Sequence, residues 1–102
     1  MNFDDSLREG YSKKISVNTI KAKSLMKSSQ QAIETAKIIP ITETSINSIF
    51  REAYEGLREY CEAIGYLKGY QLRTHESITY FLADILKENT LSAKFERYRK
   101  LR

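Results

Sequence analysis

The fold is decided by residues 46–69, which read INSIFREAYEGLREYCEAIGYLKG. Apolar side chains recur at the i, i+3, i+4, i+7 spacing of one helix face, and charged side chains fill the positions between them. The apolar set comprises Ile46, Ile49, Phe50, Ala53, Leu57, Tyr60, Cys61, Ile64 and Leu67. Gly69 suits the left-handed position that ends a helix. We therefore predict one long amphipathic helix whose apolar face is buried.

A second helix is predicted before this segment, over roughly residues 17–38. Small and apolar residues recur there at spacings of three and four. Pro40, the only proline in the chain, should break the helical pattern. Residues 42–45, which read Thr-Glu-Thr-Ser, then offer N-caps for the long helix.

Two further helices are predicted after it. Gln71, Leu72 and Arg73 are expected to form a short loop, and Thr74 to cap a helix. That helix carries Ile78, Phe81, Leu82, Ile85 and Leu86 on one face. A final helix begins near Leu91 or Ser92, and Asp4 to Lys13 form a short first helix interrupted near Gly10.

These segments indicate the fold class, because four or five amphipathic helices joined by short loops pack as a bundle. We predict an all-α domain over residues 1–102, an antiparallel four- or five-helix up-and-down bundle. No apolar run approaches the ~20 residues needed to cross a bilayer. Five tyrosines on the central helices (Tyr54, Tyr60, Tyr66, Tyr70 and Tyr80) are expected in the core or an interface rather than in a base-stacking platform.

The rare residue types exclude several kinds of site. The chain has one Cys and one His, which excludes a His/Cys zinc site. Cys61 is predicted to be a buried thiol in a reducing, cytoplasmic compartment. Glu52, Glu55, Glu59 and Glu62 alternate with arginines, so we interpret them as a solvated face rather than a cation site. We predict no metal, no cofactor and no catalytic residue.

The charge of the chain is uneven. The formal net charge is +4, and the last nine residues carry five cations and one acid. This segment is either a solvated helix end, where cations are favourable, or a phosphate-contacting patch. Lys68, Arg73 and His75 surround the predicted loop at residues 71–73. They form either an ordinary helix start or an anion-binding site at a helix N-terminus.

One family resemblance spans residues ~17–102. Residues 53–60 (AYEGLREY), 67–70 (LKGY) and 74–76 (THE) are similar to the central helix, helix stop and next helix entry of HEPN domains, the higher eukaryotes and prokaryotes nucleotide-binding domains. Residues 95–102 (FERYRKLR) resemble the basic final helix of that family. The chain is most similar to small stand-alone archaeal or bacterial HEPN proteins.

The resemblance implies a helical bundle that forms a homodimer. It also implies, for many members, a metal-independent endoribonuclease, often the toxin of a toxin–antitoxin pair encoded beside a minimal nucleotidyltransferase. The hallmark of such members is an Arg followed four to six residues later by a His. Arg99 and Arg102 match the motif Arg, but the sequence holds no His at that spacing, and His75 matches the helix-entry His. We expect the final helix to continue past Arg102.

These observations give one predicted function and two alternatives. The prediction is a HEPN-like domain that binds a nucleotide, RNA or a nucleotidyltransferase partner without ribonuclease activity in this form. The expected phosphate-binding residues are Arg99, Arg102, Lys68, Arg73 and His75. One alternative is the ribonuclease, if a His follows Arg102. The other is a structural interaction module with no nucleic-acid role. No contact with a membrane is predicted.

Overall fold

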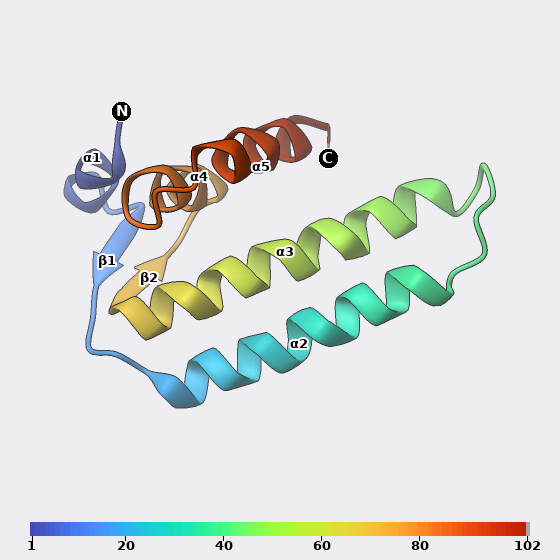
Figure 1. Cartoon of the computed structure of the whole chain (residues 1–102), viewed down its shortest axis with the longest axis horizontal. Coiled ribbons are helices and arrows are strands. Elements are labelled where there is room, and N and C mark those ends of the chain that lie inside the picture. Colours follow the sequence, from blue (N-terminus) through green and yellow to red (C-terminus); the bar gives the residue numbers. More distant parts are fainter. Residues whose placement is uncertain (102) are drawn as a thin grey trace.

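The computed structural model describes residues 1–101 and is mostly helical (Figure 1). Its elements are α1 (Phe3–Arg8), β1 (Ser12–Lys14), α2 (Thr19–Ile38), α3 (Ile46–Lys68), β2 (Tyr70–Leu72), α4 (His75–Asp84) and α5 (Asn89–Leu101). Within this range, no helix has the length and apolar character needed to cross a bilayer. The predicted helical class is therefore confirmed.

Helices α2 and α3 form a long hairpin and lie side by side (Figure 1). Close approach depends on small residues: the Ser29 hydroxyl donates a 2.7 Å hydrogen bond to the Gly56 carbonyl, and a Cβ on Gly56 would lie 2.8 Å from the Ile33 side chain. The predicted break at Pro40 is confirmed, because α2 ends at Ile38. Ser45 takes the N-cap position of α3, as predicted, but its side chain makes no cap hydrogen bond and bonds back to the preceding loop instead.

The end of α3 agrees with the prediction from sequence. Gly69 adopts φ +87° and its N–H donates to the carbonyls of Gly65 and Tyr66. A Cβ on Gly69 would lie 3.0 Å from the Ile15 carbonyl oxygen, so both conformation and space favour glycine. Thr74 caps α4 as predicted, since its side chain accepts a hydrogen bond from the Ser77 N–H.

Replacing Gly69 by alanine is expected to destabilise the fold by about 2 kcal/mol, because a left-handed non-glycine residue is strained and the new Cβ crowds a backbone oxygen. Urea denaturation followed by circular dichroism would measure the change. Gly10→Ala is the matched control for conformation alone, since Gly10 also has positive φ but an added Cβ meets nothing within 4 Å. Equal losses in the two variants would contradict the argument from crowding.

The two strands were not predicted. Ser12–Lys14 pairs antiparallel with Tyr70–Leu72, where a helix end and a loop were expected. Further bonds extend the pairing: the Ile15 N–H donates to the Gly69 carbonyl and the Arg73 N–H to the Tyr11 carbonyl. A strand of three residues is too short to show the alternation of apolar and polar side chains that predicts a β-strand. The sheet forms because two segments that are distant in sequence come into contact. The prediction of a purely α domain is wrong at these residues.

The core lies where α1, α3, α4 and β2 meet and where α5 packs on α4. Its buried members are Phe3, Tyr54, Cys61, Leu72, Ile78, Phe81, Leu82 and Phe95. The centroid of the Phe3 ring lies 5.0 Å from that of Tyr70, in an edge-to-face contact, and 5.7 Å from that of Phe81, in a tilted contact. The predicted buried stripe of α3 is wrong at Ile46, Tyr60 and Leu67, which are exposed. The reason is that α3 packs against α2 on one side and against β2 and α4 on another. The parts of its apolar face that contact neither side are exposed.

Cys61 is buried, as predicted, and burial raises the pKa of its thiol to about 12. The thiol is therefore protonated and unreactive at neutral pH, because the thiolate is the nucleophile. We expect an aromatic disulfide reagent at pH 8 to label Cys61 only at the rate of unfolding, and at once in concentrated urea. Fast labelling of the folded protein would contradict this burial.

Candidate functional site

The structure brings two of the predicted site residues into one cluster. His75 opens α4, and its Nδ1 shares a 2.6 Å hydrogen bond with the Tyr54 hydroxyl. Arg99 of α5 lies 3.4 Å from a carboxylate oxygen of Glu76, the neighbour of His75. Arg99 also pairs with Glu96, whose carboxylate accepts a bond from the Thr79 hydroxyl. Three helices therefore contribute to one polar cluster.

The other predicted site residues lie elsewhere. Lys68 is fourteen residues along α3 from Tyr54, which at 1.5 Å per residue separates them by ~21 Å along the helix. Arg73 is exposed and its side chain donates to Gln71. Arg102 lies outside the described residues. For Lys68, proximity to His75 in sequence is misleading, because β2 lies between the end of α3 and the start of α4.

Arg99 is held by carboxylates. Its hydrogen bond to Glu96 lowers the pKa of that carboxyl and raises the pKa of the guanidinium. Two acidic partners, Glu76 and Glu96, already share its charge. Arg99 therefore joins α5 to α4 in this structure, and a phosphate would have to compete with both carboxylates for it.

This ion pair predicts an acid-dependent loss of stability. Since folding lowers the Glu96 pKa below its ordinary value of 4.5, its contribution is present above that value and is lost as the pH falls through the folded-state pKa. We expect the Tm of the Glu96→Gln variant to fall less than that of the wild type between pH 6 and pH 3, measured by circular dichroism. An identical fall in both proteins would contradict this role of Glu96.

The exposed cations of α5 are Lys94, Arg97 and Lys100, which we name the α5 basic face. Among residues 1–101, neither Lys94 nor Arg97 takes part in an ion pair, and Lys100 lies 4.0 Å from Glu96. Spacings of three bring these cations onto adjoining parts of the helix surface. They are available to an external anion, unlike Arg99.

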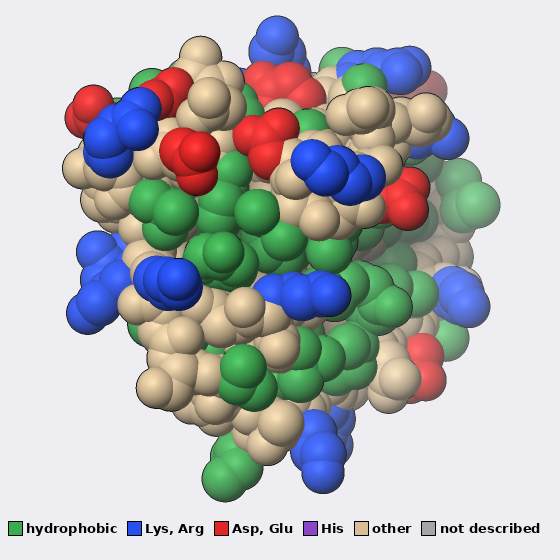
Figure 2. All heavy atoms as spheres, turned by 60° about the vertical axis from the view of Figure 1, so that its left-hand side comes forward, with side chains coloured by type: hydrophobic (Ala, Val, Ile, Leu, Met, Phe, Trp, Pro, Cys, Tyr) green, Lys and Arg blue, Asp and Glu red, His purple; other side chains and the backbone are tan. Residues whose placement is uncertain are grey.

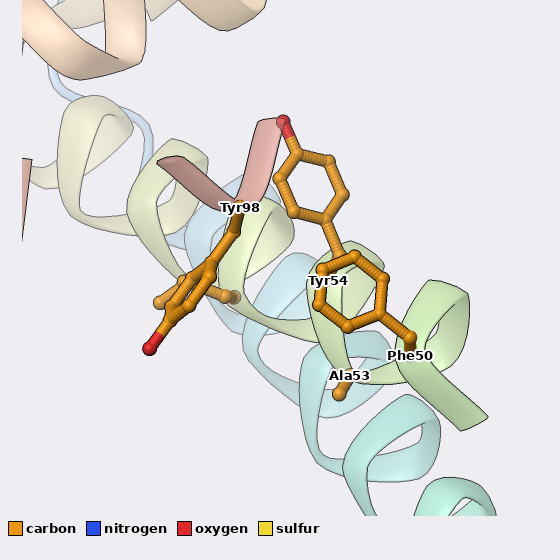
Figure 3. Close-up of a pocket in the computed structure, with 5 residues that line it drawn as sticks. Phe50, Ala53, Tyr54 and Tyr98 are labelled. Carbon is orange, nitrogen blue, oxygen red and sulfur yellow. The ribbon is translucent and has the colours of Figure 1, made fainter. Parts of the chain in front are cut away.

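An aromatic hollow lies between α3 and α5. A cavity of about 420 Å³, open to solvent, is lined by Phe50, Ala53, Tyr54, Leu57 and Tyr98, which we name the aromatic groove (Figure 3). Phe50 and Tyr98 meet edge to face at 6.3 Å, whereas Tyr54 is buried and stacks on Phe95 at 5.3 Å. Four of the residues come from α3 and Tyr98 from α5, so the groove lies where these two helices meet.

Cations border the aromatic groove on both helices. Lys94 precedes Tyr98 by four residues, so the two side chains share one side of α5. Arg51 of α3 is exposed and lines a neighbouring hollow together with Phe50 and Leu101. The sequence did not reveal this groove, because a half-buried aromatic residue fits the same helical period as a buried one. An aromatic residue between two arginines, as at Tyr98, is the one local signal.

Two glutamates of α3, Glu55 and Glu62, form ion pairs. Arg58 pairs with Glu55 at 2.6 Å and with Glu62. Burial is the largest influence on Glu62 and raises the pKa of its carboxyl, although Arg58 opposes this. Within residues 1–101, no group of three His, Cys, Asp or Glu side chains is disposed to hold a metal ion.

Comparison with known proteins gives no relative: no family model, no curated protein and no solved structure matches the chain. The resemblance to HEPN domains therefore rests on the residues quoted above. The function is therefore inferred from the geometry of the aromatic groove and the α5 basic face.

Proposed function

We propose that this protein binds single-stranded RNA at the aromatic groove and the α5 basic face. The observation that carries the proposal is an open cavity lined by Phe50, Tyr54 and Tyr98, with Lys94, which has no ion pair among residues 1–101, one helical turn from Tyr98. Nucleic acids present flat bases and anionic phosphates at regular spacing. The aromatic groove offers a surface for the bases, and the α5 basic face offers cations for the phosphates.

Stacking of bases and pairing of phosphates at this site favour a single strand over a duplex. Unpaired bases stack on aromatic side chains, which contributes about 1–3 kcal/mol per base, while a duplex keeps its bases out of reach. Phosphates pair with Lys and Arg whatever the sequence, and the bound counterions are released. The proposed binding is therefore tolerant of sequence and sensitive to salt.

The proposal includes no cleavage step. Lysine and arginine bind phosphate but do not accept a proton near neutral pH, whereas a histidine does. His75 lies at the entry of α4, and its Nδ1 is engaged in a hydrogen bond with Tyr54 of the groove lining. The ribonuclease alternative would need the additional His beyond Arg102.

The remaining expectations from the sequence and from the HEPN resemblance belong to the same proposal. They are an antiparallel up-and-down bundle, a homodimer, a minimal nucleotidyltransferase as partner and a cytoplasmic location. The long α2–α3 hairpin supports the first, and the buried, protonated Cys61 suits the last. Sedimentation equilibrium of the purified chain would test the dimer.

The binding proposal is tested with fluorescein-labelled oligouridine by fluorescence anisotropy at several salt concentrations. Three phosphate contacts on a single strand predict that log K falls with log salt at a slope of about −2. Tyr98→Ala should weaken binding by roughly tenfold or more through the lost stacking. Tyr60→Ala is a matched control, because Tyr60 is exposed on α3 and does not line the groove. No binding at the lowest salt would overturn the proposal.

A further inference from the structure

One stretch of the chain is rich in lysine, although the net charge of residues 1–93 does not reveal it. The charges of residues 1–93 cancel, yet residues 10–33 hold five lysines and neither Asp nor Glu. These lysines are Lys13, Lys14, Lys21, Lys23 and Lys27, and all are exposed. The balancing acids lie mainly in α1, α3 and α4.

Apolar side chains are exposed at the same end of the molecule. Ile20 is 82% exposed, Val17 59% and Leu67 45%. The backbone holds them close together: the Asn18 N–H donates to the Tyr66 carbonyl at 3.1 Å, and the Ile15 N–H donates to the Gly69 carbonyl at 2.8 Å. The start of α2 thus lies against the end of α3, with Lys68 beside Leu67.

Figure 2 shows this end of the molecule from outside. Hydrophobic and basic side chains alternate over the lower part of the view, while most of the visible acidic side chains gather in the upper part. A small hollow of about 220 Å³ lies between Leu67 and the start of α2, with Ala22, Met26 and Lys23 in its lining. We name the set Val17, Ile20, Leu67, Lys21, Lys23 and Lys68 the lysine-rich end.

We infer that the lysine-rich end binds the surface of an anionic lipid bilayer, although the sequence led us to expect no contact with a membrane. Aliphatic side chains that project from a fold enter the boundary between headgroups and acyl chains, and lysines reach outward to anionic headgroups. Each lysine near such a surface strengthens binding roughly fivefold. The contact is peripheral, made by one end of the α2–α3 hairpin.

The side chains favour lipid over two other anionic partners. Val17 and Ile20 are aliphatic and give a nucleic-acid base no ring to stack on, unlike the aromatic groove. An acidic peptide seated in the small hollow would leave Val17 and Ile20 uncovered, because neither lines it. A bilayer surface covers the projecting side chains and the surrounding lysines together.

The test is co-sedimentation of the full chain with vesicles of phosphatidylcholine alone and with vesicles of equal parts phosphatidylcholine and phosphatidylglycerol. Binding is expected only to the mixed vesicles. The triple variant Lys21→Gln, Lys23→Gln, Lys68→Gln should bind about a hundredfold more weakly. The double variant Val17→Ser, Ile20→Ser should bind the mixed vesicles about tenfold more weakly, because the two aliphatic side chains no longer insert.

The matched control is Lys94→Gln, Arg97→Gln, Lys100→Gln, which removes the same charge from α5 and should leave vesicle binding unchanged. All of these positions are exposed, so the variants should keep the wild-type Tm. The inference is overturned if mixed vesicles do not bind, if the α5 control loses as much as the lysine variant, or if the Val17 and Ile20 changes have no effect. Binding of oligouridine, without vesicles, through Lys21, Lys23 and Lys68 would assign this end to nucleic acid instead.

Discussion

Replacing Phe95 by alanine is expected to lower the free energy of unfolding by about 4 kcal/mol, a large part of the stability of a domain this small. Phe95 is 0% exposed and stacks on Tyr54 at 5.3 Å. Its ring is the main apolar anchor of α5, so the substitution removes buried contacts and leaves a cavity between α5 and α3. Urea denaturation monitored by circular dichroism would measure the loss.

Leu101→Ala is the matched control on the same helix. Leu101 is 68% exposed, and its truncation should change the free energy of unfolding by less than about 0.5 kcal/mol. Where Phe95→Ala leaves too little folded protein, Phe95→Leu provides a milder variant with an expected loss of about 1–2 kcal/mol. Similar small losses at Phe95 and Leu101 would show that α5 does not dock on the core as described.

Removing the α5 basic face should weaken RNA binding by about a hundredfold at low salt. The change is Lys94→Gln, Arg97→Gln, Lys100→Gln, and each charge-assisted contact is worth about 1 kcal/mol or more. The salt dependence of the residual binding should also become nearly flat, since three phosphate contacts are lost. Fluorescence anisotropy with labelled oligouridine measures both quantities.

The control for this prediction is the variant Lys21→Gln, Lys23→Gln, Lys68→Gln, which has the same net charge. It should keep most of the affinity for RNA, because these lysines lie at the far end of the α2–α3 hairpin. Equal losses in the two triple variants would mean that net charge, and no particular face, attracts the RNA. That result would contradict the proposed site.

Local signals in the sequence predicted the local structure. Pro40 ends one helix, Gly69 ends the next in a left-handed conformation, and Thr74 caps α4. Each depends on the backbone chemistry of a few neighbouring residues, so the sequence alone suffices. The i, i+3, i+4 spacing likewise located α2 and α3 to within a few residues.

Features that depend on distant contacts could not be predicted in the same way. The pairing of Ser12–Lys14 with Tyr70–Leu72 joins segments nearly sixty residues apart, and neither has a strand-like pattern of its own. Lys68 and His75 were grouped because they are close in sequence, yet the fold separates them. Phe50 and Tyr98 form a groove only once α5 has packed beside α3.

Whether a cation at a helix end can bind an external anion also depends on its ion-pair partners. Arg99 and Lys94 contribute equally to the basic composition of α5. The structure distinguishes them, since Arg99 pairs with Glu76 and Glu96 whereas Lys94 is exposed without an ion pair among residues 1–101. Glu96 is three residues away on the same helix, but Glu76 is on another helix, so the sequence could not show this second partner.

The most direct test of the central claim is an NMR titration of the isotope-labelled chain with oligouridine. The proposed site predicts chemical-shift changes concentrated at residues 50–57 of α3 and 94–101 of α5, around the aromatic groove and the α5 basic face. Residues 13–27 and Lys68 should change little. Shifts confined to the lysine-rich end, or none at saturating oligouridine, would contradict the account of how this protein binds RNA.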